Sequence, residues 1–572
     1  MKRFKEILYE FSISELHNFI GRDLIELLEN WSENGSDISK KNSLIELYIK
    51  IKGINDLKEV EFRTKLLNKL NDNEINSFKN MLGKKYKDYD IDELIDVIKN
   101  KKWGKNDISN HWLKILDINS NDIEEHEEEK ENTIDNISTE SDFYELLDYQ
   151  FVIKQKILNL LNSDHSIPRA LVHMPTGTGK TKTSMHTLVY HYLYNLKREG
   201  IVIWMAHTNE LIEQAINTFK TTWKHIGKGD VNLVRVYGKN TPSIEDINDG
   251  IVFCGFQKLI SIKNNNKELF DKLCERCRLL VVDEAHKSTA TETLGVINQL
   301  MIEKTGMLTR GLIGLTATPG RSMNDNQENA KLVALYEDNI ISVDTELLSS
   351  INKSPFQYYN QKVEKDVISY LQYKHILAKI KRQSLNYSEK LNQHILNQAS
   401  KKVKKETNDF NNKFLLEIGE VKTRNLVILK KLENLNEGNM PTIVFACSVQ
   451  HGKLISAALT LRGIKNKCVF GEMNIKDRAN AIKEFKDRNN DMNILINYEV
   501  LTTGFDSTNI RCVLITRPTK SIVLYSQMLG RGLRGPMMGG NEECLLIDID
   551  DNLESYTNES MAFRFFDNYW NK

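Results

Sequence analysis

A stretch of twelve residues, ALVHMPTGTGKT from Ala170 to Thr181, constrains the fold of this chain more than any other. It begins with a short apolar run, continues through a proline and two glycines, and ends where Lys180 opens a long apolar-patterned run. This order predicts a strand, a loop and the start of a helix. Gly177 and Gly179 let the backbone curl around an anion, and a helix N-terminus presents N–H groups to it. The stretch therefore predicts a phosphate-binding loop.

Each part of this loop has an expected role toward a nucleoside triphosphate. Lys180 would reach the β and γ phosphates, and the Thr181 hydroxyl would bind Mg²⁺. The residues expected to line the nucleotide are Pro175, Thr176, Gly177, Thr178, Gly179, Lys180 and Thr181. Met174 stands where the usual phosphate-loop pattern has glycine, so the pattern is imperfect at its first position.

A pair of carboxylates follows a second apolar run, Leu279 to Val282. Open α/β sheets place ligands at the carboxyl ends of their strands, which is where Asp283 and Glu284 would stand. Asp283 suits Mg²⁺, and Glu284 can polarise an attacking water. A solvated acidic turn would explain a lone Asp-Glu pair, but a phosphate loop in the same chain favours the catalytic interpretation.

Length and composition predict a multidomain cytoplasmic protein. At 572 residues the chain is long enough for about three or four domains. It holds no apolar run of membrane-spanning length, and Lys5, Glu6 and Glu10 interrupt the N-terminus too early for a signal peptide. Seven cysteines, an odd number, favour reduced thiols. Cys274 and Cys277 form a CxxC without a second half-site, which favours a structural role over zinc.

A formal net charge of zero hides a strong asymmetry along the chain. Residues 121–140 carry nine acids against one lysine, and residues 361–435 carry sixteen Lys/Arg against eight Asp/Glu. The first segment, which lacks aromatic residues, is typical of a flexible tether. The second contains Lys401, Lys402, Lys404 and Lys405, which would either neutralise a nucleic-acid backbone or form a solvated helix face.

The order of patterns along the chain predicts its domains. Apolar residues at helical spacing fill the first part, and two later parts alternate strands with helices, which implies parallel sheets covered by helices. The expected segments are an all-α N-terminal domain at 1–120, an acidic linker at 121–141, an α/β domain at 142–345, a basic helical insertion at 346–435, a second α/β domain at 436–555 and a tail at 556–572.

Three further polar residues suit a nucleotide. The amide of Gln150, upstream of the phosphate loop, can donate to and accept from adenine at once. Arg531 and Arg534 share one face of a helix start, and planar guanidiniums suit phosphate oxygens. A structural salt bridge for one of these arginines is the alternative.

Five motifs together resemble those of superfamily 2 nucleic-acid-dependent ATPases, the DEAD/DEAH helicase group. The motifs are MPTGTGKT at 174–181, DEAH at 283–286, LTATP at 315–319, LTTGFD at 501–506 and QMLGRGLR at 527–534. They fall in family order over residues 143–552, and they look most similar to the helicase subunits of type III and type I restriction enzymes and related bacterial defence translocases. The resemblance implies two RecA-like domains that enclose ATP.

The same resemblance implies roles for further residues. The second domain would contribute Gly504, Asp506, Gln527, Arg531 and Arg534, with Arg534 as the arginine finger. Nucleic acid would lie on His207, Thr208, Phe256, Gln257, Ser448 and Thr502, mainly through its backbone, which carries no base sequence. Thr316 and Thr318 would couple the two sites. Leu147 and Gly255 depart from the family pattern, which weakens adenine recognition by Gln150 and removes one expected phosphate contact.

The expected function is an ATP- and Mg²⁺-dependent helicase or translocase, with DNA favoured over RNA as its track. A role in anti-phage defence or repair follows from the resemblance alone. The N-terminal domain would bind a protein partner, for example a nuclease or effector subunit. The alternative is an ATP-gated sensor that binds nucleic acid and signals to a partner without processive unwinding.

Overall fold

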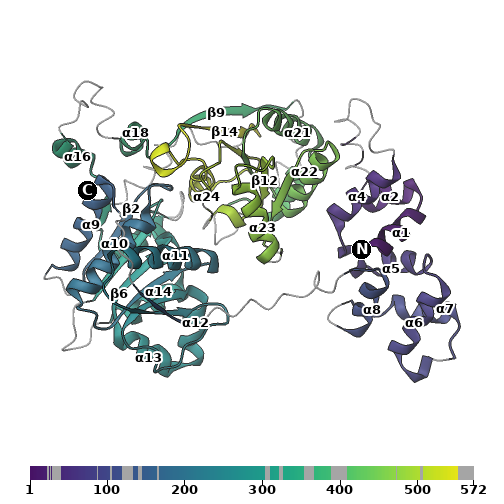
Figure 1. Ribbon diagram of the computed structural model, residues 1–572, viewed down its shortest axis with the longest axis horizontal. Helices are drawn as coiled ribbons and strands as arrows, with labels where there is room; N and C mark the ends of the chain where they lie inside the picture. Colours follow the sequence, from purple (N-terminus) through teal and green to yellow (C-terminus); the bar gives the residue numbers. More distant parts are fainter. Residues whose placement is uncertain are drawn as a thin grey trace. The chain divides into compact units, whose positions relative to one another are not determined.

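The computed structural model describes most of the chain, and Figure 1 shows its elements. The described residues are 1–21, 25, 28, 40–86, 88–103, 106–118, 133–138, 145–163, 167–302, 310–320, 326–352, 366–387, 409–471, 473, 475–502, 505 and 507–551. They fall into two compact units. The first unit lies within Met1–Glu129, Leu385–Gln398 and Asn412–Glu499, and the second lies within Lys130–Ser384, Ala399–Asn411 and Val500–Lys572.

The N-terminal part is helical in its described residues, as predicted. Its helices are α1 (Lys2–Glu10), α2 (Ile13–Ile20), α4 (Lys41–Lys52), α5 (Val60–Leu67), α6 (Asp72–Leu82), α7 (Ile91–Lys99) and α8 (Asp107–Ile115). Capping boxes start α2, α6 and α7: the side chains of Ser12, Asn71 and Asp90 each accept a backbone N–H three residues on, where a glutamate returns the bond. Phe62 and Tyr48 pack with Phe19 inside this domain.

The first sheet has eight strands in the order β1-β4-β5-β3-β6-β7-β2-β8. These strands are β1 (Ile134–Ile137), β2 (Arg169–His173), β3 (Ile201–Ala206), β4 (Val231–Val236), β5 (Gly250–Gly255), β6 (Cys277–Asp283), β7 (Gly311–Thr316) and β8 (Ile340–Ser342). All neighbours pair in parallel except β1, which is antiparallel to β4. Every residue of β3, β6 and β7 is buried, as expected for strands of a parallel sheet covered on both faces.

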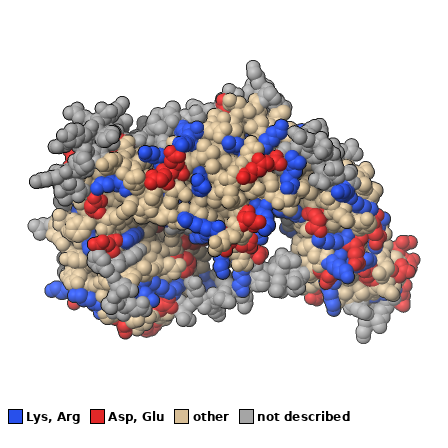
Figure 2. Space-filling view, turned by 45° about the horizontal axis from the view of Figure 1, so that its top comes forward, with Lys and Arg blue, Asp and Glu red and all other residues tan. Residues whose placement is uncertain are grey.

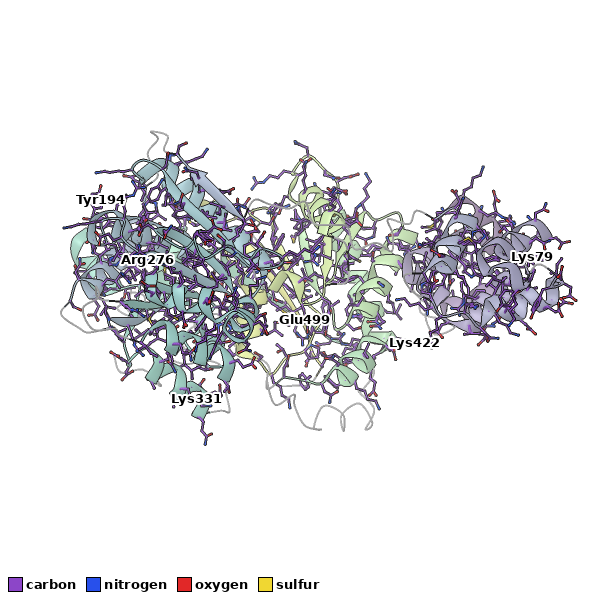
Figure 3. The ribbon with its side chains drawn as sticks, turned by 90° about the horizontal axis from the view of Figure 1, so that it is seen from below. Lys79, Tyr194, Arg276, Lys331, Lys422 and Glu499 are labelled. Atoms are coloured by element: carbon purple, nitrogen blue, oxygen red, sulfur yellow. The ribbon has the colours of Figure 1, made fainter. Side chains whose placement is uncertain are left out.

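Helices cover both faces of this sheet (Figure 1). They are α9 (Asp148–Leu161), α10 (Lys180–Tyr190), α11 (Asn209–Ile226), α12 (Phe256–Asn265), α13 (Lys267–Arg276), α14 (Thr291–Leu300) and α15 (Asn326–Leu335). Apolar residues of α12, α13 and α14 form one core with β3, β5 and β6, while α10 packs with α9 and α11. The side chain of Lys331 on α15 points outward (Figure 3).

The second sheet has six strands in the order β11-β12-β10-β13-β14-β9. Its elements are β9 (Lys379–Leu385), β10 (Thr442–Phe445), β11 (Asn466–Val469), β12 (Ile494–Asn497), β13 (Cys512–Ile515) and β14 (Glu543–Ile549), with α22 (Val449–Leu461), α23 (Ile475–Lys486) and α24 (Ile522–Leu529) between them. The pairs β10–β12, β11–β12 and β13–β14 are parallel. Two tandem RecA-like sheets therefore agree with the predicted fold class.

Two predicted segments contain strands that the pattern did not indicate. Within the acidic segment, β1 pairs with the edge of the first sheet, so residues 134–137 are not a tether. Within the segment predicted to be helical, β9 joins the edge of the second sheet. The helices there are α16 (Thr345–Asn352), α18 (Val367–Tyr373), α20 (Asn412–Gly419) and α21 (Lys422–Glu437).

Charges of both signs are interspersed on the face shown in Figure 2. The most acidic and most basic stretches of the sequence, around residues 121–132 and 388–408, lie outside the described residues. Among the described residues, no helix is long and apolar enough to cross a membrane.

Candidate active site

Three neighbouring strands of the first sheet bring the MPTGTGKT, DEAH and LTATP motifs to one edge. Strand β7 lies between β6 and β2, and their registers pair Asp283 with Leu315 and His173 with Thr316. The three strands are parallel, so their carboxyl ends meet at the same edge. The phosphate loop after β2, the carboxylates after β6 and the threonines after β7 therefore stand together, as predicted.

The phosphate loop needs both of its glycines. Gly177 and Gly179 have φ angles of +86° and +77°, in the left-handed region that favours glycine. A Cβ on Gly179 would also overlap the Gln150 side chain. The Thr178 hydroxyl donates to the Pro175 carbonyl over 2.7 Å, and α10 begins at Lys180. The loop and the helix N-terminus thus form the anion-binding arrangement that the sequence predicts.

Gln150 braces the phosphate loop in this structure. Its Nε2 donates to the Thr178 carbonyl over 2.9 Å and to the Tyr149 hydroxyl over 3.2 Å, while its Oε1 accepts the Leu147 N–H over 3.0 Å. The Tyr149 hydroxyl donates to the same Thr178 carbonyl over 2.6 Å. Both side chains are buried, with 1% or less of their surface exposed. These contacts use both ends of the Gln150 amide. Recognition of adenine by Gln150 stays a prediction.

The two carboxylates after β6 differ in their surroundings. Asp283 is buried, and this burial raises the pKa of its carboxyl, with Lys180 acting in the opposite direction. Burial also opposes ionisation of Glu284, but nearby Lys180 and His286 outweigh it and lower the pKa of Glu284. Glu284 has a φ angle of +51°, in the left-handed region that a residue with a Cβ rarely adopts. An ionised Glu284 suits a base that orients water.

Thr316 connects the DEAH motif to the LTATP motif. Its hydroxyl donates to the Thr318 carbonyl over 2.7 Å, accepts the Thr318 N–H over 3.0 Å and lies 3.3 Å from Nδ1 of His286. Its carbonyl accepts the N–H of Met174 over 3.1 Å, and Nε2 of His173 lies 3.2 Å from the Ala317 carbonyl. The predicted coupling residues thus contact both the phosphate loop and the DEAH segment.

The two predicted arginines take different places. A Cβ on Gly177 would meet the Cγ of Arg534 at 3.5 Å, so the Arg534 side chain lies directly against the phosphate loop. Arg531 instead donates from Nε to the Gln527 carbonyl over 3.3 Å, from Nη2 to the Thr502 carbonyl over 2.8 Å, and from Nη1 to the Phe505 carbonyl. The guanidinium of Arg531 therefore holds the backbone of the LTTGFD segment, whereas the Cγ of Arg534 lies against the phosphate loop, and its role as arginine finger stays a prediction.

The predicted nucleic-acid residues of the first domain stand side by side. Strands β3 and β5 are neighbours, and the rings of His207 and Phe256 are 6.4 Å apart. The Thr208 side chain caps α11 by accepting the Leu211 N–H over 3.3 Å, and Gln257 is exposed. Nε2 of His207 lies 2.6 Å from Nζ of Lys287, so this edge adjoins the DEAH motif. The sequence analysis did not single out Lys287.

The remaining predicted residues are divided between the two units and the undescribed residues. Ser448 caps α22 by accepting the His451 N–H over 3.0 Å, and Thr502 offers its carbonyl to Arg531. Gln527 is buried, and its Nε2 meets no hydrogen-bond partner among the described residues. Residues outside the described part are Gly504, Asp506, Lys401, Lys402, Lys404 and Lys405. Cys274 and Cys277 are buried free thiols, and no described group of His, Cys, Asp and Glu could hold a metal on its own.

Sequence reasoning missed Tyr149, Lys287 and Leu377, which contact the site. Leu377 lies against the phosphate loop, with its Cδ2 3.8 Å from where a Cβ of Gly177 would stand. Tyr149 adjoins Gln150 in the sequence and Lys287 follows the DEAH motif, so adjacency to a motif was the available signal for both. No signal in the sequence indicated Leu377.

Comparisons with known proteins agree with this geometry. Residues 143–321 match the family described as type III restriction enzyme, res subunit, and residues 424–535 match the helicase conserved C-terminal domain. IRC3 of Saccharomyces cerevisiae, named as an ATP-dependent helicase, is 25% identical over 66% of this chain and 48% of its own length. Helicase 22 of a Sulfolobus islandicus filamentous virus is 21% identical over 98% of this chain and 88% of its own.

The chain spans about half the length of IRC3. Among solved structures, the Hef helicase domain of Pyrococcus furiosus covers 70% of this chain and 95% of its own, at 16% identity and a TM-score of 0.40.

The fold and the site together define the class of protein. A phosphate loop and an Asp-Glu pair at the carboxyl edge of a parallel RecA-like sheet, followed by a second such sheet with an arginine segment, define a P-loop nucleotide-binding protein of two RecA-like domains. The two family matches, over residues 143–321 and 424–535, support a superfamily 2 helicase close to the res subunits of type III restriction enzymes.

Proposed function

We propose that this protein is a nucleic-acid-dependent ATPase that works as a helicase or translocase. The observation that carries the proposal is the meeting of the phosphate loop, the DEAH carboxylates and Arg534 within one compact unit. ATP is the proposed substrate, and Mg²⁺ is the proposed metal cofactor. Lys180 would bind the β and γ phosphates, and Thr181 and Asp283 would hold the metal.

The residues present fit such a ligand. Gly177 and Gly179 leave free the space that side chains would fill, and the N–H groups that start α10 have no helical partners of their own. The buried Nε2 of Gln527 meets no partner among the described residues, which fits a site completed by a ligand. A bound divalent metal would supply charge neutralisation at the phosphates.

The chemistry then divides among three side chains. Glu284, which a lowered pKa keeps ionised, would orient and polarise the water that attacks the γ-phosphate. Lys180 and Arg534 would stabilise the negative charge that develops on the phosphate oxygens. Thr316 joins the DEAH segment to the LTATP motif. It would transmit the structural change that accompanies ATP hydrolysis to the edge that carries His207 and Phe256.

We extend the proposal to partners and setting. DNA is favoured as the track, with His207, Thr208, Phe256, Gln257, Ser448 and Thr502 as its contacts, and the match to restriction-enzyme res subunits supports a role in defence or repair. The N-terminal helices would recruit a protein partner. All seven cysteines are free thiols, which supports a reducing compartment such as the cytoplasm.

The test is ATP turnover with single-stranded DNA, duplex DNA and RNA side by side. Lys180→Ala and Glu284→Gln should each lower the stimulated kcat by at least about 100-fold, because each removes charge or base from the reacting centre. Lys331→Ala is the matched control: it removes an exposed lysine on α15 whose side-chain partner is Glu328. Retention of wild-type turnover by either site variant would overturn the assignment. If both variants lose turnover, strand-displacement assays with the wild-type protein separate a motor from a sensor, because a sensor hydrolyses ATP without displacing a strand.

A further inference from the structure

A short segment, residues 374–379, runs from the end of α18 to the first residue of β9. Its backbone is paired with residues 533–542, the segment that contains Arg534. We call residues 374–379 the strap. Its Ala378 N–H donates to the Leu533 carbonyl over 2.8 Å, and its Ile376 carbonyl accepts the Gly535 N–H over 2.9 Å. A bridge joins Leu377 to Arg534 between these two bonds. The residue on each side of Arg534 is therefore fixed to the strap.

Two more backbone bonds extend this pairing. The Met537 N–H donates to the His375 carbonyl over 3.0 Å, and the Lys379 N–H donates to the Glu542 carbonyl over 2.9 Å. The two bonds that flank the Leu377–Arg534 bridge share one antiparallel register, and the bonds to Met537 and Glu542, which lie outside that register, fix the strap at two further points. A shift of the strap would therefore move the backbone of Arg534 with it.

The other end of the strap is fixed near the phosphate loop. Nζ of Lys374 lies 3.6 Å from Oδ2 of Asp148, which starts α9, the helix whose Tyr149 and Gln150 hold the Thr178 carbonyl. Helix α18, which leads into the strap, is anchored by Tyr370 and Leu371, both 2% exposed or less. The strap thus joins the helix that braces the phosphate loop to the segment that carries Arg534.

Leu377 and Arg534 meet at the same glycine. Both approach Gly177, Leu377 through Cδ2 and Arg534 through Cγ, and Leu377 is only 1% exposed. Because Leu377 is packed, it limits where the Arg534 side chain can lie above the phosphate loop. Contact on one side and backbone pairing on the other leave Arg534 little freedom.

Gly535 makes the close pairing possible. Its φ and ψ angles of −84° and 173° are extended, so another residue could adopt this backbone conformation. A Cβ there would nevertheless overlap the His375 carbonyl oxygen and stand 2.7 Å from the Ile376 carbonyl carbon. Glycine is therefore required at position 535 because the strap backbone passes close to its Cα, and not because the chain makes an unusual turn there.

We propose that the strap is a positioning device for Arg534: Leu377 and the strap backbone, with Gly535 opposite, hold the guanidinium where it acts on a bound triphosphate. This inference rests on the proposed function, because it needs Arg534 to contribute to hydrolysis. Leu377 and Gly535 are positioning residues, since they act through Arg534. The strap adds a part of the chain that neither family match includes, because the matches end at residue 321 and resume at residue 424.

The experiment measures kcat and KM for ATP, with saturating nucleic acid, in the full-length protein. Gly535→Ala should lower kcat by about 10- to 100-fold, because misplacement by a fraction of an ångström disturbs a transition-state contact. Leu377→Ala, which leaves a small cavity, should lower kcat by about 5- to 20-fold and serves if Gly535→Ala does not fold. KM should change less than about 3-fold in both, because Lys180 and the N–H groups of the phosphate loop, which neither substitution removes, supply most of the contacts to the bound triphosphate. Gly471→Ala is the control, since a Cβ there meets nothing within 4 Å.

A double-mutant cycle with Arg534→Ala distinguishes positioning from general damage. In the Arg534→Ala background, Gly535→Ala or Leu377→Ala should lower the single-turnover rate no further, because the side chain that they position is already gone. An equal further loss in that background, or an unchanged kcat in the wild-type background, would overturn the strap proposal. Full turnover by Arg534→Ala alone would instead show that the assignment of the arginine finger is wrong, and the strap proposal would fall with it.

Discussion

Burial lowers the pKa of several histidines in this protein, among them His191, His286 and His451. His451 is the clearest example: the Cys447 N–H donates to its Nδ1 over 3.1 Å, so its Nε2–H donates to Asn425 over 3.0 Å. The Asn425 amide in turn donates to the Gly419 carbonyl over 2.8 Å. Burial, followed by the nearby Arg424, lowers the pKa of His451 to about 3. This network joins α20, α21 and α22.

The lowered pKa predicts acid sensitivity. The unfolded chain binds a proton at His451 near the ordinary pKa of about 6.5, whereas the folded chain does not. The stability that the neutral His451 side chain contributes is therefore complete above about pH 6.5. As the pH falls toward 3, this contribution to the free energy of unfolding is lost, by up to about 1.4 kcal/mol per pH unit. His451→Gln should lower the melting temperature at pH 7 but flatten its decline between pH 7 and pH 5. The same decline in wild type, His451→Gln and the α11 control His225→Gln would contradict this account.

At the residue scale, the sequence indicated which side chains lie at the edge of the sheet that carries the phosphate loop better than it indicated the contacts that each one makes. Lys180, Asp283, Glu284 and Arg534 stand where their motifs predict. Arg531 resembles Arg534 in type and spacing, but its donors are used by three backbone carbonyls. Which carbonyls lie within reach of a guanidinium is a matter of tertiary packing, and the sequence cannot show it.

At the element scale, β1 shows that part of the acidic segment has a structural role. Asp135 accepts from Nη1 of Arg235 over 2.9 Å and from Nζ of Lys220 over 2.7 Å. Arg235 lies on β4 and its side chain is only 3% exposed. The strand therefore brings a carboxylate to a buried guanidinium at the sheet edge, and removal of this carboxylate would take an ion-pair partner from a buried charge.

The ion pair of β1 gives a direct test. Asp135→Ala should lower the free energy of unfolding by about 1–3 kcal/mol, because the buried Arg235 and the neighbouring Lys220 both lose this ion-pair partner. Asn136→Ala changes the next residue of β1, which is exposed, and should stay within about 0.5 kcal/mol of wild type. Chemical denaturation followed by tryptophan fluorescence measures both. Equal midpoints for the two variants would show that β1 adds no stability.

Strands β1 and β9 escaped the sequence analysis for a physical reason. Strand β1 has only four residues in an acidic segment, and six of the seven residues of β9 are exposed or half-buried. Neither has the apolar alternation that marks a half-buried strand. Their pairing partners, β4 and β14, supply the hydrogen bonds and apolar surface, so the signal for these edge strands lies elsewhere in the chain.

At the scale of the whole molecule, the alternating strand and helix patterns predicted both parallel sheets and the helical N-terminal part. Continuous apolar runs such as β3 and β6 carry that information locally. The strap was not predictable, because its contacts join residues 374–379 to residues 533–542 through backbone groups that every residue type shares. Such pairing over a long sequence separation is decided by the assembled fold.

The most direct test of the central claim is an experimental structure with a non-hydrolysable ATP analogue, Mg²⁺ and a nucleic-acid strand. We predict the β and γ phosphates on Lys180 and the N–H groups of residues 177–181, the metal between Thr181 and Asp283, and the Arg534 guanidinium in hydrogen-bonding contact with the γ-phosphate. A triphosphate bound elsewhere, or an Arg534 guanidinium with no contact to the γ-phosphate, would contradict the account.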